Sequence, residues 1–169
     1  MSDRAGRPRP AGRVSRRSLR GREHGNETIG ADGAGPTASS DASRTLIDAA
    51  RRARRHAHAQ FSGFKVGAAL EAQDGTIITG CNIENATYGL TLCAERVAVF
   101  KAISEGVRKF RRVAVVADTD TLTPPCGACR QILWEFCGDV PVVLVNLQGK
   151  TETYQLKDLL PKPFDASYL

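Results

Sequence analysis

Two short motifs of this chain contain cysteine and glutamate residues that could bind a metal ion and transfer protons. The first is Cys93-Ala94-Glu95, and the second is Pro125-Cys126-Gly127-Ala128-Cys129. Cys126 and Cys129 are three positions apart at a predicted helix start, so their side chains share one face of that helix. Cys93 stands at the start of another predicted helix. Thiolates at helix N-termini are favoured by the helix dipole and by unpaired backbone amides. The spacing therefore predicts three thiolates around one metal ion.

The three-cysteine set predicts a catalytic zinc rather than a structural one. Three protein ligands leave the fourth tetrahedral position to water, whose pKa zinc lowers toward neutrality. Glu95 is too near Cys93 in sequence to be a comfortable fourth ligand, yet close enough to take a proton from that water. Three thiolates give the centre a net negative charge, which Arg96 could offset by donating hydrogen bonds to a sulfur. We therefore expect one Zn²⁺ per subunit, with Glu95 as the proton shuttle.

Two plainer interpretations of the Cys-x-x-Cys spacing are a redox pair and half of a structural zinc site. A redox pair does not require the Cys93 motif 33 positions upstream of Cys126. A structural site would need a fourth Cys or His. The spare cysteines, Cys81 and Cys137, are more typical of small buried apolar residues, and the three histidines lie outside any metal motif, at positions 24, 56 and 58. The compound signal favours the catalytic zinc site.

The elements that must position these motifs follow from the apolar periodicity. We expect helices at about 43–58, 92–104, 126–136 and 156–160. We expect strands at about 65–71, 76–83, 112–117, 140–145 and 151–154. Asp74-Gly75 indicates a hairpin turn between the first two strands. Apolar strands linked by helices predict an α/β domain whose mixed or parallel sheet is covered by helices on both faces.

The charge of the chain is concentrated in residues 1–40. This stretch has eight arginines and four acids, whereas the remaining 129 residues have 16 basic and 14 acidic side chains. Its few large apolar residues predict a disordered tail, with the folded domain over 41–169. The tail could be a tether to nucleic acid or a membrane surface, an organelle transit peptide, or a solvated extension without a role. We favour the solvated extension. The charges of the domain are nearly balanced, so we expect no nucleic-acid partner. The sequence shows no apolar membrane span and no export signal, so we expect a cytoplasmic enzyme without a membrane partner.

Beyond the metal motifs, the chain resembles the cytidine deaminase family, in its small homotetrameric class with a three-cysteine zinc site. Four blocks carry the resemblance in order: FSGFKVGAAL at 61–70, GCNIENATYGLTLCAERVA at 80–98, PCGACRQILWEF at 125–136 and LLPKPF at 159–164. Together they cover about residues 45–169. The resemblance implies a three-layer α/β/α fold with a mixed five-stranded sheet. It also implies conversion of cytidine and deoxycytidine to uridine and deoxyuridine.

The resemblance also implies which residues bind a nucleoside. Asn82 and Glu84 are similar to a pair that contacts the sugar 3′-hydroxyl, and Phe64 to an aromatic residue that packs on the pyrimidine. The backbone of Ala86 is similar to a contact with the base. Two further residues, Tyr88 and Phe164, are similar to residues that reach a neighbouring subunit's site, which implies a homotetramer with shared active sites. Gln131 and Trp134 we interpret as helix packing, with no role in the site.

Other functions compete with this interpretation. A deaminase of the blasticidin type shares the zinc motifs, but the Asn82 and Glu84 pair argues for an ordinary nucleoside. A polynucleotide deaminase would need an open channel with stacking aromatics and a basic stripe, and only the tail is strongly basic. A nucleic-acid-binding zinc module would leave Glu95 and the segment at 82–89 without a purpose.

Overall fold

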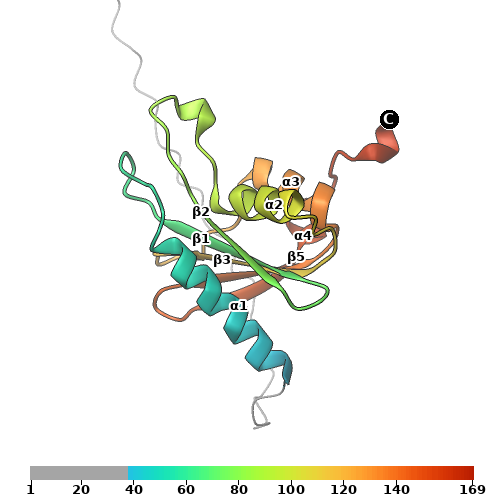
Figure 1. The fold of residues 1–169 in the computed structure, drawn as a ribbon, viewed down its shortest axis with the longest axis horizontal. Helices are drawn as coiled ribbons and strands as arrows, with labels where there is room; N and C mark the ends of the chain where they lie inside the picture. Colours follow the sequence, from blue (N-terminus) through green and yellow to red (C-terminus); the bar gives the residue numbers. More distant parts are fainter. Residues whose placement is uncertain (1–37) are drawn as a thin grey trace, which may run out of the picture. The chain divides into compact units, whose positions relative to one another are not determined.

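The structure, a computed structural model, describes residues 38–169 (Figure 1). Residues 1–37 of the predicted tail lie outside the described residues. In chain order the elements are α1 (Ala38–Arg54), β1 (Val66–Ala72), β2 (Ile77–Cys81), the 3-10 turn η1 (Tyr88–Leu90), α2 (Ala94–Ser104), β3 (Phe110–Ala117), α3 (Gly127–Cys137), β4 (Pro141–Asn146), β5 (Thr151–Gln155), α4 (Leu156–Leu159) and the 3-10 turn η2 (Ala166–Tyr168). None of the helices in this described part is both long and apolar enough to span a membrane.

The strands form one sheet in the order β2-β1-β3-β4-β5. The β3 and β4 strands run parallel, and every other neighbouring pair is antiparallel, so the predicted mixed five-stranded sheet is confirmed. The parallel pair follows from the intervening helix α3, which returns the chain to the same edge. The predicted hairpin turn is also present: Gly75 has a φ of +90°, and the Thr76 amide donates to Asp74 Oδ1 at 2.9 Å.

Helices cover both faces of the sheet, as the three-layer prediction requires. On one face α1 buries Leu46 and Ala50 against Ala69, Val116 and Val145 of the strands. On the other face α2 and α3 lie over a larger apolar cluster (Figure 1). Neighbouring residues of one strand enter opposite clusters because side chains alternate across a sheet. The two layers therefore share one central sheet, and α2 and α3 come together on the same face.

Two glycines let the helices approach the sheet closely. A Cβ at Gly80 of β2 would lie 2.5 Å from the carbonyl oxygen of Ala94, the first residue of α2. A Cβ at Gly67 of β1 would lie 2.1 Å from the carbonyl oxygen of Ala50 in α1. Both distances are far below van der Waals contact, so a side chain at either position would push the helix away. Gly80 therefore sets the height of the α2 N-terminus above the sheet.

The first helix differs in its bounds from the prediction of 43–58. It begins at Ala38 and ends at Arg54, so residues 55–58 are not helical. His58 instead pairs with the chain leaving β2: its amide donates to the Asn82 carbonyl at 3.0 Å, and its carbonyl accepts from the Glu84 amide at 2.8 Å. These long-range hydrogen bonds replace the last helical turn, which local periodicity alone could not reveal.

Candidate active site and metal centre

The N-termini of α2 and α3 meet over the same part of the sheet, and each begins with a cysteine. Cys93 is the N-cap of α2 and Cys126 is the N-cap of α3, both with extended backbone angles. Cys129 lies in the first turn of α3 and is fully buried. The first amides of a helix have no intrahelical acceptor, so both ends carry positive potential. The sequence prediction that two helix starts bring the three sulfurs together is confirmed.

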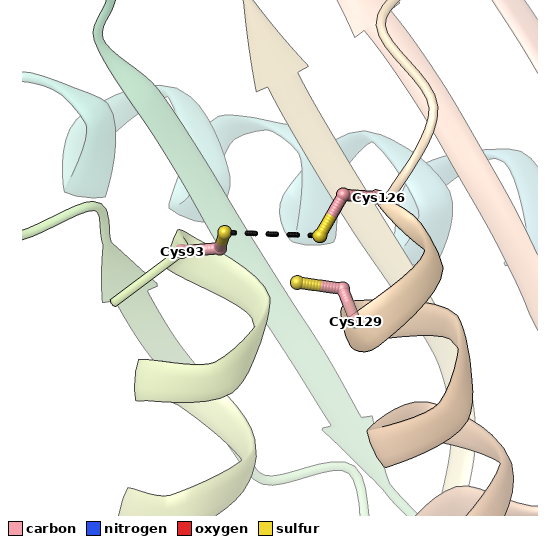
Figure 2. Close-up of side chains that lie close together, drawn as sticks. All are labelled: Cys93, Cys126 and Cys129. Carbon is pink, nitrogen blue, oxygen red and sulfur yellow. Dashed lines mark hydrogen bonds between the residues drawn. The ribbon is translucent and has the colours of Figure 1, made fainter. Parts of the chain in front are cut away.

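The three sulfurs point toward one another, as Figure 2 shows. Cys93 Sγ and Cys126 Sγ are 3.9 Å apart, and all three Sγ atoms lie within 4.8 Å of one another. Two sulfurs bound at about 2.3 Å in tetrahedral geometry would be about 3.8 Å apart. The cluster therefore has the size that a single zinc ion requires, and its soft sulfur donors suit zinc.

Arg96 lies beside this cluster, as expected if its positive charge offsets that of the thiolates. Its Nη2 donates to the Thr91 carbonyl at 2.7 Å and lies 3.8 Å from Cys93 Sγ. The pKa of Cys93 is lowered to about 5, chiefly by the hydrogen bond with Cys129 and also by Arg96. The same hydrogen bond raises the pKa of Cys129, so these contacts favour the thiolate at Cys93, which is the ligand form that zinc takes.

Glu95 is almost completely buried on the first turn of α2, with 4% of its surface exposed. Burial raises its pKa to about 7, because a carboxylate loses hydration in this surrounding. Its side chain lines a cavity of about 240 Å³ that Cys93 and Cys126 also line. A carboxyl group that can both hold and release a proton near neutral pH therefore shares a cavity with the sulfur cluster.

The same cavity is lined by three of the predicted nucleoside-binding residues, Phe64, Asn82 and Glu84. Phe64 precedes β1, whereas Asn82 and Glu84 follow β2, so the antiparallel hairpin places them side by side. A second cavity of about 370 Å³ shares Glu84 with the first and extends past Phe61 and Tyr88. The two adjoining cavities have room for a small molecule.

Hydrogen bonds show how the chain holds two of these side chains. Asn82 is buried: its Oδ1 accepts from the Val66 amide and its Nδ2 donates to the Phe64 carbonyl, both at 2.8 Å. Glu84 Oε2 accepts from the amides of Phe61 at 2.8 Å and Ser62 at 3.2 Å, and Oε1 accepts from the Ser62 hydroxyl. The Ser62 hydroxyl and these amides lower the pKa of Glu84, so its carboxylate is ionised at neutral pH. Asn82 and Glu84 thus also fix the loop that carries Phe64.

The remaining predicted residues lie in exposed segments. Ala86 is in the loop between β2 and η1, and Tyr88 begins η1 with 77% of its surface exposed. The Tyr88 ring meets the Phe61 ring edge-on, with centroids 6.2 Å apart. Phe164 is 59% exposed and stacks on Tyr168. Phe164 does not line the 240 Å³ cavity of its own chain, whose lining residues all lie between 64 and 126.

Comparison with known families agrees with this geometry. The model of the cytidine and deoxycytidylate deaminase zinc-binding region matches residues 40–145, which include all three cysteines and Glu95. The chain belongs to the cytidine and deoxycytidylate deaminase family. The match is to the family's zinc-binding region, and the sulfur cluster accommodates one zinc ion per subunit.

Individual relatives support this membership of the deaminase family. The chain is 54% identical to a cytidine deaminase of Sporosarcina psychrophila over 127 residues, which are 73% of this chain and 93% of the relative. The crystal structure of cytidine deaminase from Burkholderia pseudomallei superposes with a TM-score of 0.70 at 48% identity, covering 72% of this chain and 98% of that one. These matches confirm the α/β/α fold predicted from the sequence.

The blasticidin-type alternative receives less support. The blasticidin-S deaminase of Bacillus cereus is 31% identical over 104 residues, covering 57% of this chain and 74% of the relative. The deaminase family thus includes this activity at a greater distance, and the similarity does not favour it for this chain.

Sequence reasoning missed some residues of the site. Thr91, Thr123 and Pro124 line the 240 Å³ cavity. Thr91 lies in the block at 80–98 but was assigned no role, and Thr123 and Pro124 directly precede the second zinc motif. Gln131 and Trp134, which we interpreted as helix packing, hold the C-terminal segment through hydrogen bonds. The only available signal was their place in the second zinc motif, and it does not reveal a partner about 30 residues away.

Proposed function

We propose that this chain removes the C4 amino group of cytidine and deoxycytidine by hydrolysis, giving uridine or deoxyuridine and ammonia. The observation that carries the proposal is the cavity that Glu95 shares with Cys93 and Cys126 of the sulfur cluster. Phe64, Asn82 and Glu84 line the same cavity. Relatives at up to 54% identity are described as cytidine deaminases, which supports this substrate.

In this proposal Cys93, Cys126 and Cys129 hold the metal. A zinc ion bound there would supply a water molecule of lowered pKa as the nucleophile for C4 of the base. Arg96 lies near Cys93 Sγ and partly neutralises the charge of the thiolates. The positive N-terminal ends of the α2 and α3 dipoles also stabilise the thiolates.

Glu95 transfers the protons. Its carboxylate takes a proton from the attacking water and delivers it to the ring nitrogen N3, and it then transfers the second proton of that water to the leaving amino group. The carbon–nitrogen bond breaks, ammonia leaves and the carbonyl of the uracil ring forms. A pKa of about 7, raised by burial, suits a group that must act as base and then as acid.

The substrate contacts are assigned to the residues around the cavity. We propose that Phe64 packs on the pyrimidine ring and that the backbone of Ala86 contacts the base. Asn82 and Glu84 bind the sugar 3′-hydroxyl as donor and acceptor. Each of them retains hydrogen-bonding capacity beyond the backbone contacts described above, because an amide nitrogen has two hydrogens and each carboxylate oxygen has two lone pairs.

The resemblance implies that the active unit is a homotetramer with shared sites. Large exposed rings at Phe61, Tyr88, Phe164 and Tyr168 support this proposal, because such rings are typical of protein interfaces. Tyr88 and Phe164 then contact the site of a neighbouring copy. The cytoplasmic location and the lack of a nucleic-acid or membrane partner stay predictions.

An ultraviolet assay of the purified full chain tests the proposed function. Cytidine, deoxycytidine, blasticidin S and a cytosine-containing single-stranded DNA are offered separately, and zinc content is measured on the same sample. We expect turnover of the first two nucleosides and one zinc ion per chain. Turnover of blasticidin S or DNA with no turnover of either nucleoside would refute the substrate. Salt-sensitive binding of DNA without any deamination would favour the zinc-module alternative.

A further inference from the structure

The C-terminal segment, residues 160–169, is held by side chains of α3. Gln131 makes two hydrogen bonds with the backbone of Phe164: its Oε1 accepts from the Phe164 amide at 3.1 Å, and its Nε2 donates to the Phe164 carbonyl. The segment around Phe164 has no regular secondary structure that would pair these backbone groups. A primary amide supplies donor and acceptor together, so Gln131 replaces a strand partner.

Two other side chains of α3 bind the C-terminal segment or the residue directly before it. Trp134 Nε1 donates to Asp165 Oδ2 at 3.2 Å. Arg130 Nη1 donates to the Leu159 carbonyl at 2.6 Å, and Arg130 Nε donates at 2.7 Å to the Pro125 carbonyl, directly before Cys126. Three side chains within five residues of α3 therefore bind the chain between 159 and 165. We call this set of contacts the C-terminal clamp.

The clamp binds the backbone of Leu159 and Phe164 and the carboxylate of Asp165, and it leaves the aromatic rings of the segment exposed. Phe164 and Tyr168 are 59% and 68% exposed, and their rings stack with centroids 5.4 Å apart and 13° between planes. Gln131 lies only two residues after Cys129 on α3. The helix that supplies two metal ligands thus also sets the position of the exposed rings.

We propose that Gln131 is a positioning residue, which holds Phe164 in the orientation that a neighbouring copy's substrate site needs. The proposal rests on the proposed function, in which Phe164 reaches that site. Gln131 acts on substrate affinity through Phe164, and it acts neither on zinc nor on the chemical step. Trp134 and Arg130 strengthen the same clamp.

Kinetics of three variants test the role of Gln131. Gln131→Ala removes both hydrogen bonds, and Gln131→Glu keeps the acceptor but loses the donor. We expect KM for cytidine to rise roughly tenfold in Gln131→Ala and less in Gln131→Glu, with kcat and zinc content near those of the parent. Glu135→Ala is the matched control, because Glu135 is exposed on the same helix and, among the described residues, has no hydrogen bond or ion pair with the C-terminal segment. An unchanged KM in Gln131→Ala, or a loss of zinc, would overturn the proposal.

A double-mutant cycle asks whether Gln131 acts through Phe164. Phe164→Ala removes the ring but keeps the backbone groups that Gln131 binds. If the ring is the only route, Gln131→Ala combined with Phe164→Ala has the KM of Phe164→Ala alone. Effects of the two changes that add fully would contradict this route.

Trp134 reports on the clamp without any enzyme assay, because it is the only tryptophan of the chain and is hydrogen-bonded to Asp165. In Gln131→Ala we expect its fluorescence to shift to longer wavelength as the segment detaches and water reaches the indole. In Phe164→Ala and Glu135→Ala the emission stays that of the parent. Should the parent fail to deaminate cytidine, the proposed function falls, whereas an unshifted emission in Gln131→Ala rejects the clamp itself.

Discussion

Replacing Gly80 by alanine should damage the metal centre from outside it. The added Cβ would lie 2.5 Å from the Ala94 carbonyl oxygen and 2.5 Å from the Ala98 nitrogen, both in the backbone of α2. Ordinary contact begins at 3.4 Å, so the first turn of α2 must move by about 0.9 Å. This turn carries Glu95 and follows Cys93 directly. The displacement would therefore move Glu95 and Cys93 relative to the other two cysteines.

We expect Gly80→Ala to lower the free energy of unfolding by about 1–3 kcal/mol. Because a displacement near 1 Å can cost about a hundredfold in rate, kcat/KM for cytidine should fall by about that factor in protein that is still folded. Zinc affinity, measured by competition with a fluorescent chelator, should fall as well. Thermal unfolding and kinetics are measured on the same preparation, so that loss of folded protein is separated from loss of activity.

Gly67→Ala is the matched control for this experiment. Its Cβ would lie 2.1 Å from the Ala50 carbonyl oxygen, so it strains the packing of α1 on the opposite face of the sheet. It should destabilise the fold at least as much as Gly80→Ala, while the folded fraction keeps its zinc affinity. The reasoning is refuted if Gly80→Ala retains full activity and zinc affinity, or if both variants lose zinc equally.

Four further predictions concern the site and the tail. Glu95→Gln should retain zinc and lose about 10²–10⁴-fold in kcat, because an amide cannot transfer protons; a near-normal rate excludes the shuttle role. Cys126→Ala should lose zinc, and one full equivalent by metal analysis would contradict its role as ligand. Glu84→Ala should lower kcat/KM for nucleosides by about ten- to a hundredfold with zinc retained, since it removes charged hydrogen bonds; unchanged nucleoside kinetics would remove the ribose assignment. Deletion of residues 1–37 should leave kcat/KM unchanged, because the residues assigned to the site lie between Phe61 and Phe164; a large fall in turnover would refute this.

The types of the metal ligands and the chemistry they perform could be predicted from local patterns in the chain. Cys93 and Cys126 each precede a run of helical periodicity, and a cysteine at a helix start is exposed to unpaired amides whatever the rest of the fold does. The Asp74-Gly75 turn and the apolar strands were equally local signals, and they predicted a mixed or parallel sheet with helices on both faces. Such features depend on neighbours within a few positions along the chain. The mixed five-stranded sheet was implied by the family resemblance.

How these parts meet depends on long-range packing, which the local patterns do not contain. The 3.9 Å between Cys93 Sγ and Cys126 Sγ depends on two helices packing on one face of the sheet, and Gly80 permits that approach. The end of α1 at Arg54 and the clamp of Gln131 on Phe164 depend on partners that are more than 20 residues away. Hydrogen bonds of this kind leave no periodic pattern in the chain, because backbone groups accept any partner that the fold brings within reach.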